Sequence, residues 1–111
     1  MNLQEAELAQ TLASAFGVTV ALKGPVTYIA DDERVVVMDE GTPALAKAGT
    51  GDVLAGMVGA LLAQGVAAFE ATVCASLLHA RAGRIAAEAL TDIGVAAEDV
   101  VEAIPAAIRT L

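Results

Sequence analysis

The chain has 111 residues, enough for one domain with a real core, and 57% of them are hydrophobic. Its formal net charge is −8 and its six Lys and Arg residues are scattered, so a nucleic-acid-binding protein is excluded. A small anion is not excluded, because backbone N–H groups can bind one. Because the chain is so apolar, we also expect apolar surface that packs against another part of the protein or against another subunit.

The sequence predicts no membrane-spanning helix and no signal peptide. The longest uncharged stretch, residues 53–69, is interrupted by Gly56, Gly59 and Gly65 and is shorter than the roughly 20 apolar residues that a span needs. A buried helix is the better interpretation of it. Cys74 is the only cysteine, so no disulfide forms within the chain and a reducing, cytoplasmic location is expected.

The first 38 residues show one helical pattern followed by three strand patterns. Asn2 and Glu5 have capping-box spacing, apolar residues then recur at helical intervals, and Gly17 ends the predicted helix. Residues 18–22, 26–30 and 34–38 are rich in β-branched and apolar residues and are separated by turn residues. Three short strands joined by tight turns are therefore predicted.

A polar loop and three helices follow. Residues 39–51 carry Gly and Pro and predict a binding loop, and helices are predicted over 52–64, 69–90 and 98–110, with a kink or restart at Pro105. The order predicts one α/β domain over residues 1–111. Three strands are too few to cover four helices, which indicates missing strands, so the chain is interpreted as a partial domain.

The loop from Gly41 to Gly51 leads directly into an apolar helix and predicts an anion site. Gly49 and Gly51 permit positive φ angles and close approach of the backbone, and the first N–H groups of a helix have no partner within it. Asp52 stands at the mouth of this helix. On spacing alone, its carboxylate serves equally as a helix cap or as a catalytic group.

Gly49-Thr50-Gly51-Asp52 and the residues after it resemble the Gly-x-Gly-Asp signature of the ribokinase-like superfamily. Residues 22–27 (Leu-Lys-Gly-Pro-Val-Thr), 43–46 (Pro-Ala-Leu-Ala) and 78–83 (Leu-His-Ala-Arg-Ala-Gly) resemble the NAD(P)H-hydrate dehydratase pattern within it. The resemblance covers nearly the whole chain but only the C-terminal half of the family's catalytic domain. It implies the C-terminal portion of a ribokinase-like three-layer fold, with the N-terminal half absent.

The resemblance also implies an activity and its residues. A nucleotide, ATP or ADP with Mg²⁺, phosphorylates the ring hydroxyl of hydrated NADH or NADPH, and elimination of phosphate restores the cofactor. Asp52 would be the catalytic base and would face the hydrate, as would Thr42, which stands where the family usually has Asn. The nucleotide would be bound by Lys23, Gly24, Pro25, Val26, Thr27, Gly49, Thr50 and Gly51.

Two residues also have purely structural interpretations. Without the motif beside it, Lys23 is a solvated lysine at a strand end, and His79, the only histidine, is a hydrogen-bonded packing residue rather than a ligand or an acid. No second His or clustered Cys indicates a protein-bound metal.

Two alternative functions remain open. The first is a kinase of a sugar or vitamin precursor that shares the Gly-x-Gly-Asp loop. The second is an inactive piece that acts only in association, either with the missing half or as a homo-oligomer, because of its surplus of apolar surface. The expected partners are otherwise a nucleotide and hydrated NAD(P)H, with neither nucleic acid nor membrane.

Overall fold

The computed structural model describes residues 2–111. Over these residues it contains α1 (Leu3–Phe16), β1 (Val20–Leu22), β2 (Thr27–Ala30), β3 (Val35–Met38), the 3-10 helix η1 (Pro43–Leu45), α2 (Thr50–Ala63), α3 (Ala68–Gly94) and α4 (Ala97–Ile108). The predicted order of a helix, three short strands, a loop and three helices is confirmed. Within the loop, the short helix η1 was not predicted.

The first helix begins and ends as its sequence predicts. The Asn2 Oδ1 atom accepts hydrogen bonds from the N–H groups of Gln4 at 3.0 Å and Glu5 at 3.3 Å. At the other end Gly17 is left-handed, with φ 62°, and its N–H group donates to the Ala13 carbonyl. Both ends of α1 are therefore set by local hydrogen bonds.

The three strands form an antiparallel sheet in the order β1-β2-β3. In its register Ile29 pairs with Ala21 on one side and with Val36 on the other. Tyr28 and Ala30 of β2 pack against buried alanines of α1 and form the first of two apolar cores. The Tyr28 hydroxyl also accepts a hydrogen bond of 2.7 Å from the Asn2 N–H group.

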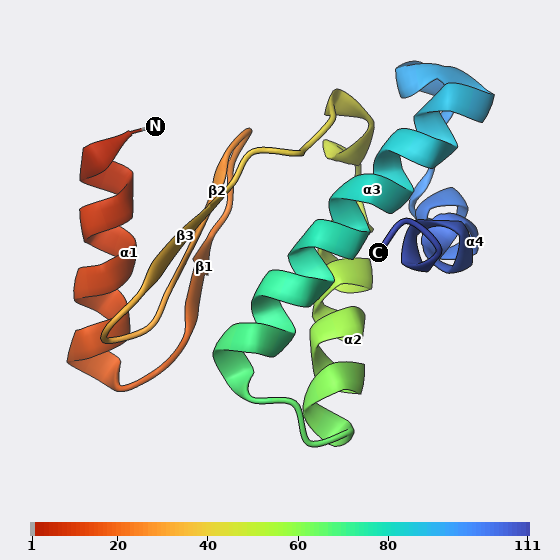
Figure 1. The fold of residues 1–111 in the computed structure, drawn as a ribbon. Helices are drawn as coiled ribbons and strands as arrows, with labels where there is room; N and C mark the ends of the chain where they lie inside the picture. Colours follow the sequence, from red (N-terminus) through yellow and green to blue (C-terminus); the bar gives the residue numbers. More distant parts are fainter. Residues whose placement is uncertain (1) are drawn as a thin grey trace.

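Helices lie on both sides of this sheet. Figure 1 shows the strands between α1 and the pair α2 and α3, with α4 beyond that pair. The second core is built mainly from α3 and α4 and includes Leu78, Val95 and Val100. Cys74 is half-buried at the edge of this core. The arrangement confirms an α/β fold in three layers.

Arg34 joins the turn between β2 and β3 to the start of α3. Its guanidinium donates to the Asp31 carboxylate at 2.7 Å and to the Glu70 carboxylate at 2.9 Å, and it lies 4.0 Å from the centre of the Phe69 ring. Hydrogen bonds from Arg34 lower the pKa of both carboxyl groups. The predicted hairpin tip is thus attached to a helix.

The last two helices differ from their prediction in one respect each. The long third helix is interrupted at Thr91, whose φ of 66° and ψ of 163° are not helical, one residue after the predicted end. The helix α4 continues through Pro105 as one helix, so the expected restart does not occur. Because Val101, four residues earlier, is exposed, water can satisfy the carbonyl group that Pro105 leaves without an N–H donor.

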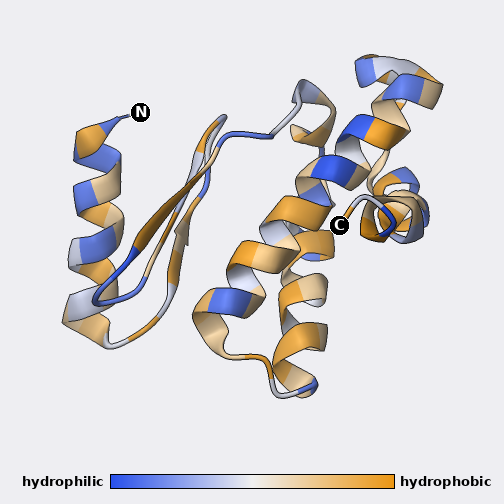
Figure 2. Cartoon of the chain, viewed as in Figure 1, coloured by the Kyte–Doolittle hydropathy of each residue, from blue (hydrophilic) through white to orange (hydrophobic). Residues whose placement is uncertain are grey.

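The helix α2 is much less buried than predicted. Figure 2 shows it as mostly hydrophobic along its length, yet only Thr50 and Leu54 are buried, and Gly56, Gly59 and Leu62 are exposed. The helices α3 and α4 contact only one side of it, which leaves the other side to solvent. Part of the surplus of apolar surface expected from the composition lies here, and the rest lies on other elements, for example at Phe16 and Ile93. Within residues 2–111, no helix combines the length and the apolar character needed to cross a membrane.

Two helical glycines give a matched test of packing. A Cβ atom on Gly83 would lie 2.8 Å from the Leu45 Cγ atom of η1, whereas one on Gly56 would meet nothing within 4 Å. Gly83→Ala should lower the free energy of unfolding by about 1–2 kcal/mol through overpacking. Gly56→Ala should raise it by about 0.5–1 kcal/mol, because alanine loses less backbone entropy in a helix. Urea denaturation measures both, and equal stabilisation by the two substitutions would contradict the close contact.

Candidate functional site

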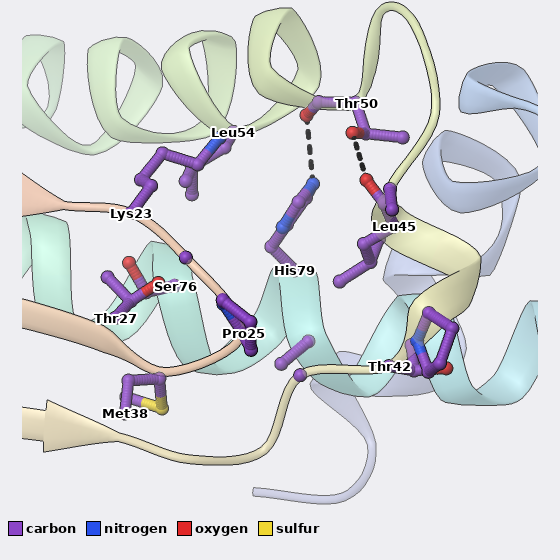
Figure 3. Close-up of a pocket in the computed structure, with 15 residues that line it drawn as sticks. Lys23, Pro25, Thr27, Met38, Thr42, Leu45, Thr50, Leu54, Ser76 and His79 are labelled. Carbon is purple, nitrogen blue, oxygen red and sulfur yellow. Dashed lines mark hydrogen bonds between the residues drawn. The ribbon is translucent and has the colours of Figure 1, made fainter. Parts of the chain in front are cut away.

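A pocket of about 600 Å³ lies where the turn after β1, the η1 segment, the start of α2 and the middle of α3 meet (Figure 3). Much of its wall is apolar and includes Met38, Leu45 and Leu54. Six of the predicted site residues also line it, namely Lys23, Gly24, Pro25, Thr27, Thr42 and Thr50, and so does His79. The structure therefore brings together three segments that are far apart in the sequence.

Four other predicted site residues, Val26, Gly49, Gly51 and Asp52, do not line this pocket. Val26 is half-buried and packs against the core between α1 and the sheet. The other three belong to the start of α2, beside the pocket. The candidate site thus consists of a pocket and an adjoining helix N-terminus.

The two glycines at the start of α2 have different roles. Gly49 is the N-cap and has a φ of 89°, which confirms the predicted left-handed conformation. For Gly51 that prediction is wrong, because Gly51 lies inside the first turn of α2. A Cβ atom there would lie 3.3 Å from the Lys23 Nζ atom. Gly51 therefore leaves room for the lysine ammonium against the helix N-terminus.

The first turn of α2 presents free donors. The Thr50 N–H group donates to the Lys47 carbonyl at 3.4 Å, and the Val53 N–H group donates to the Gly49 carbonyl at 3.2 Å. Between them, the N–H groups of Gly51 and Asp52 have no acceptor within residues 2–111. Unpaired N–H groups, the positive end of the helix dipole and the Lys23 ammonium together favour an anion at this point.

Thr50 connects the loop, α2 and α3. Its Oγ1 atom lies 2.6 Å from the Leu45 carbonyl oxygen and 3.0 Å from that of Lys47, so its hydroxyl donates into the loop. Its own carbonyl accepts from the His79 Nε2 atom at 2.9 Å, as the dashed lines of Figure 3 show. The hydroxyl and the carbonyl of Thr50 are therefore both hydrogen-bonded within the chain.

His79 is buried, with 6% of its surface exposed. Burial lowers the pKa of His79 below its usual value of 6.5; the hydrogen bond to Thr50 opposes this, and the charge of Lys23 adds to it. The imidazole is therefore neutral at pH 7. Because a carbonyl only accepts, the Nε2 atom carries the proton. His79 is thus buried and hydrogen-bonded, as the packing interpretation expects, and it also lines the pocket.

Thr42 lines the pocket and caps η1. Its Oγ1 atom accepts from the Ala44 N–H group at 3.3 Å and donates to the Asp92 carboxylate at 3.3 Å. The hydroxyl thus already has one donor and one acceptor partner, and one lone pair remains for a ligand. Its contact with a substrate stays a prediction.

Asp52 is exposed in the first turn of α2. The N-cap is Gly49, three residues earlier, so the interpretation of Asp52 as the cap is wrong. The helix begins earlier than predicted because the left-handed Gly49 ends the loop. Among residues 2–111, no group donates a hydrogen bond to the Asp52 carboxylate. The carboxylate can therefore accept a proton from a bound molecule beside the anion site.

The sequence analysis missed part of this site. The apolar wall residues and Ser76 were not singled out, although Ser76, His79 and Ala80 have the spacing of one helical face. Lys47, which was also missed, donates to the carbonyl groups of Asp92 at 2.7 Å and Val95 at 2.8 Å. No sequence signal indicates that contact, because the partners are main-chain atoms more than 40 positions away.

The family model and two of the known proteins that this chain resembles share one description. The family model described as NAD(P)H-hydrate dehydratase matches residues 1–106. The ADP-dependent (S)-NAD(P)H-hydrate dehydratase of Cenarchaeum symbiosum is 34% identical over 94% of this chain and 36% of its own length. The enzyme with the same description from Neisseria meningitidis is 45% identical over 69% of this chain and 26% of its own length.

A solved structure agrees with this match. The Bacillus subtilis protein YxkO, of the UPF0031 family, superposes with a TM-score of 0.88 at 28% identity, over 95% of this chain and 40% of the other. The chain spans about a third or less of the curated relatives it matches. Over nearly its whole length, then, this chain belongs to the NAD(P)H-hydrate dehydratase family.

Proposed function

We propose that this chain forms part of a catalytic domain that uses ATP or ADP to dehydrate hydrated NADH and NADPH. The observation that carries the proposal is the start of α2, where two unpaired N–H groups and the Lys23 ammonium adjoin the unpaired Asp52 carboxylate. An anion-binding point next to a free carboxylate is what transfer of a phosphoryl group to a hydroxyl requires. The relatives described as ADP-dependent dehydratases support the same reaction.

In the proposed reaction, the ring hydroxyl oxygen of the hydrate attacks the terminal phosphorus of the nucleotide. Its proton passes to the Asp52 carboxylate, and the nucleotide leaves one phosphate shorter. The phosphate then leaves the ring together with a proton from the neighbouring carbon, which forms the double bond of NADH or NADPH. The N–H groups of Gly51 and Asp52 bind the transferred phosphate and compensate the charge on its oxygen atoms.

Binding of the nucleotide is assigned in this proposal to two segments. The turn from Lys23 to Thr27 forms one side of the pocket, and Gly49, Thr50 and Gly51 begin α2. Thr50 contributes through the loop that its hydroxyl holds, and Val26 through the core contact that fixes the turn. Thr42 contacts the hydrate through its remaining lone pair.

Mg²⁺ is proposed to accompany the nucleotide. Within residues 2–111, no group of three or more His, Cys, Asp or Glu side chains has the arrangement to hold a metal ion. Mg²⁺ is often bound by one or two carboxylates and the phosphates of a substrate, with water completing the shell. In this proposal Asp52 takes the proton, so the phosphates of the nucleotide and water would supply the ligands of such an ion, which would neutralise charge on the phosphates.

The remaining features of the proposal concern partners and location. The exposed apolar side of α2, with Leu62, Gly56 and Gly59, is proposed to be covered either by the rest of the catalytic domain or by a second copy. The curated relatives are longer than the chain, which supports the former. A cytoplasmic location is proposed because the lone Cys74 fits a reducing compartment.

Replacement of Asp52 tests the proposed reaction. In a native protein that contains the chain, Asp52→Asn should lower the rate of NADH recovery from its hydrate by about 10²–10⁴-fold, because the proton acceptor is lost. Recovery is followed by the near-ultraviolet absorbance of NADH with ATP or ADP. Nucleotide affinity, measured by calorimetry, should change little.

Asp32→Asn is the matched control, because Asp32 is exposed in the turn between β2 and β3. Full activity of Asp52→Asn would remove Asp52 from the mechanism. A wild-type protein that binds nucleotide but recovers no NADH would instead favour the kinase alternative, which a screen for phosphorylated sugars and vitamin precursors would test.

Acid should weaken the fold through His79. Its pKa is lowered in the folded chain, so between that pKa and the usual 6.5 the unfolded chain binds more protons. The contribution of His79 is complete above pH 6.5 and is lost as the pH falls below it. The lowered pKa values of Asp31 and Glu70 act later, below their usual values of 3.8 and 4.5.

Thermal unfolding between pH 7.5 and 5 measures this effect. The melting temperature of the wild-type chain should fall over that interval, and that of His79→Gln, which keeps a donor for the Thr50 carbonyl, should fall less. Parallel slopes for the two proteins would show that His79 is not the titrating group.

A further inference from the structure

The second lysine of the chain binds the junction between α3 and α4. The Lys47 Nζ atom lies 2.7 Å from the carbonyl oxygen of Asp92, 2.8 Å from that of Val95 and 3.3 Å from that of Ile93. An ammonium group has three N–H donors, so these contacts use all of them. Lys47 is therefore not available to bind phosphate, although it stands two residues before Gly49 in the anion-binding loop.

The junction that Lys47 binds contains a strained residue. Thr91 has a φ of 66° and a ψ of 163°, and it is the only residue other than glycine with a positive φ in residues 2–111. That region is populated almost exclusively by glycine, and other residues stay there only where surrounding contacts hold them. The Thr91 hydroxyl accepts from the Gly94 N–H group at 3.3 Å, and the next carbonyl, of Asp92, accepts from Lys47.

A second contact joins the same two segments. Thr42, at the start of η1, donates to the Asp92 carboxylate at 3.3 Å, while Lys47, after the end of η1, donates to the Asp92 carbonyl. The two polar side chains that flank η1 thus meet at one residue. This holds the loop on both sides of η1 to the end of α3.

The backbone of Lys47 continues this connection to the anion site. Its carbonyl accepts from the Thr50 N–H group at 3.4 Å and lies 3.0 Å from the Thr50 Oγ1 atom. Thr50 is the first residue of α2, and the free N–H groups of Gly51 and Asp52 follow directly. One residue therefore contacts the α3–α4 junction with its side chain and the start of α2 with its main chain.

We propose that Lys47 is a positioning residue for the anion site, because its bonds to the α3–α4 junction fix the direction in which α2 begins. The N–H groups of Gly51 and Asp52 then converge on one point without Lys47 touching the ligand. That the ligand is the nucleotide phosphate rests on the proposed function. The fixing of the loop rests only on the contacts described here.

The two lysines provide a matched pair of variants, since Lys23→Met and Lys47→Met remove the same charge, one from the anion site and the other from the α3–α4 junction. Lys47→Met should weaken ADP binding, measured by calorimetry, by at least about tenfold, as expected for a displaced binding group. It should also speed hydrogen exchange at the Thr50 and Val53 amides, but not at Ile29 in the sheet. Lys47→Arg should restore much of the ADP affinity and of the amide protection, because a guanidinium also donates to carbonyl groups.

Lys23→Met should weaken ADP binding and leave amide exchange at Thr50 and Val53 unchanged. Arg84→Met, on the exposed side of α3, controls for the loss of one positive charge. If Lys47→Met binds ADP as the wild type does, or leaves those amides protected, the positioning role is wrong. If the native protein that contains the wild-type chain does not bind ADP at all, the proposed function fails, and the exchange measurement still decides the role of Lys47.

A double-mutant cycle tests the coupling between Lys47 and Thr91 without any ligand. Thr91→Gly should raise the melting temperature of the wild type, because glycine adopts the conformation of residue 91 without strain. In Lys47→Met the gain should be smaller, because the junction is already free to relax. Thr91→Gly also keeps the Lys47→Met chain folded if the single variant is unstable. Equal gains in the two backgrounds would overturn the coupling.

Discussion

The candidate site depends on the buried hydrogen bond between His79 and the carbonyl of Thr50. The bond joins the middle of α3 to the first residue of α2, at the point where the binding loop becomes a helix. The Thr50 hydroxyl holds the preceding loop through the Leu45 carbonyl. A buried carbonyl without a donor is costly, so this residue pair specifies where α2 begins. The direction of the free N–H groups follows from that start.

The neutral state of His79 is part of the same arrangement. Burial chiefly lowers the pKa of His79, and the charge of Lys23, which lies against Gly51, adds to this effect. A neutral His79 still donates through Nε2, while Lys23 supplies the positive charge at the anion site. His79 thus fixes the start of α2, and Lys23 attracts the anionic ligand. Glycine at position 51 permits this, because any side chain there would meet the lysine ammonium.

The sequence predicted most of the fold because local signals mark the ends of its elements. Asn2, Gly17 and the β-branched and apolar residues of the strands act through neighbours in the chain, and α1 and the three strands match their predictions. The burial of α2 could not be predicted, since it depends on what packs against the helix. Similarly, a left-handed Gly49 and a helical Gly51 give the same sequence signal, and only the structure, in which α2 begins at Thr50, distinguishes them.

For the two lysines, too, the contacts in the structure could not be predicted from the sequence. In sequence, Lys23 ends a strand and Lys47 precedes a glycine-rich turn, and the family resemblance assigns only Lys23 to the nucleotide. In the structure, Lys23 reaches the start of α2 from the neighbouring sheet, whereas the ammonium of Lys47 is bound by main-chain carbonyl groups. A helix that ends near a lysine is a strong acceptor, because its last carbonyl groups lack partners. The end of α3 therefore decides which of the two lysines is free to bind an anion.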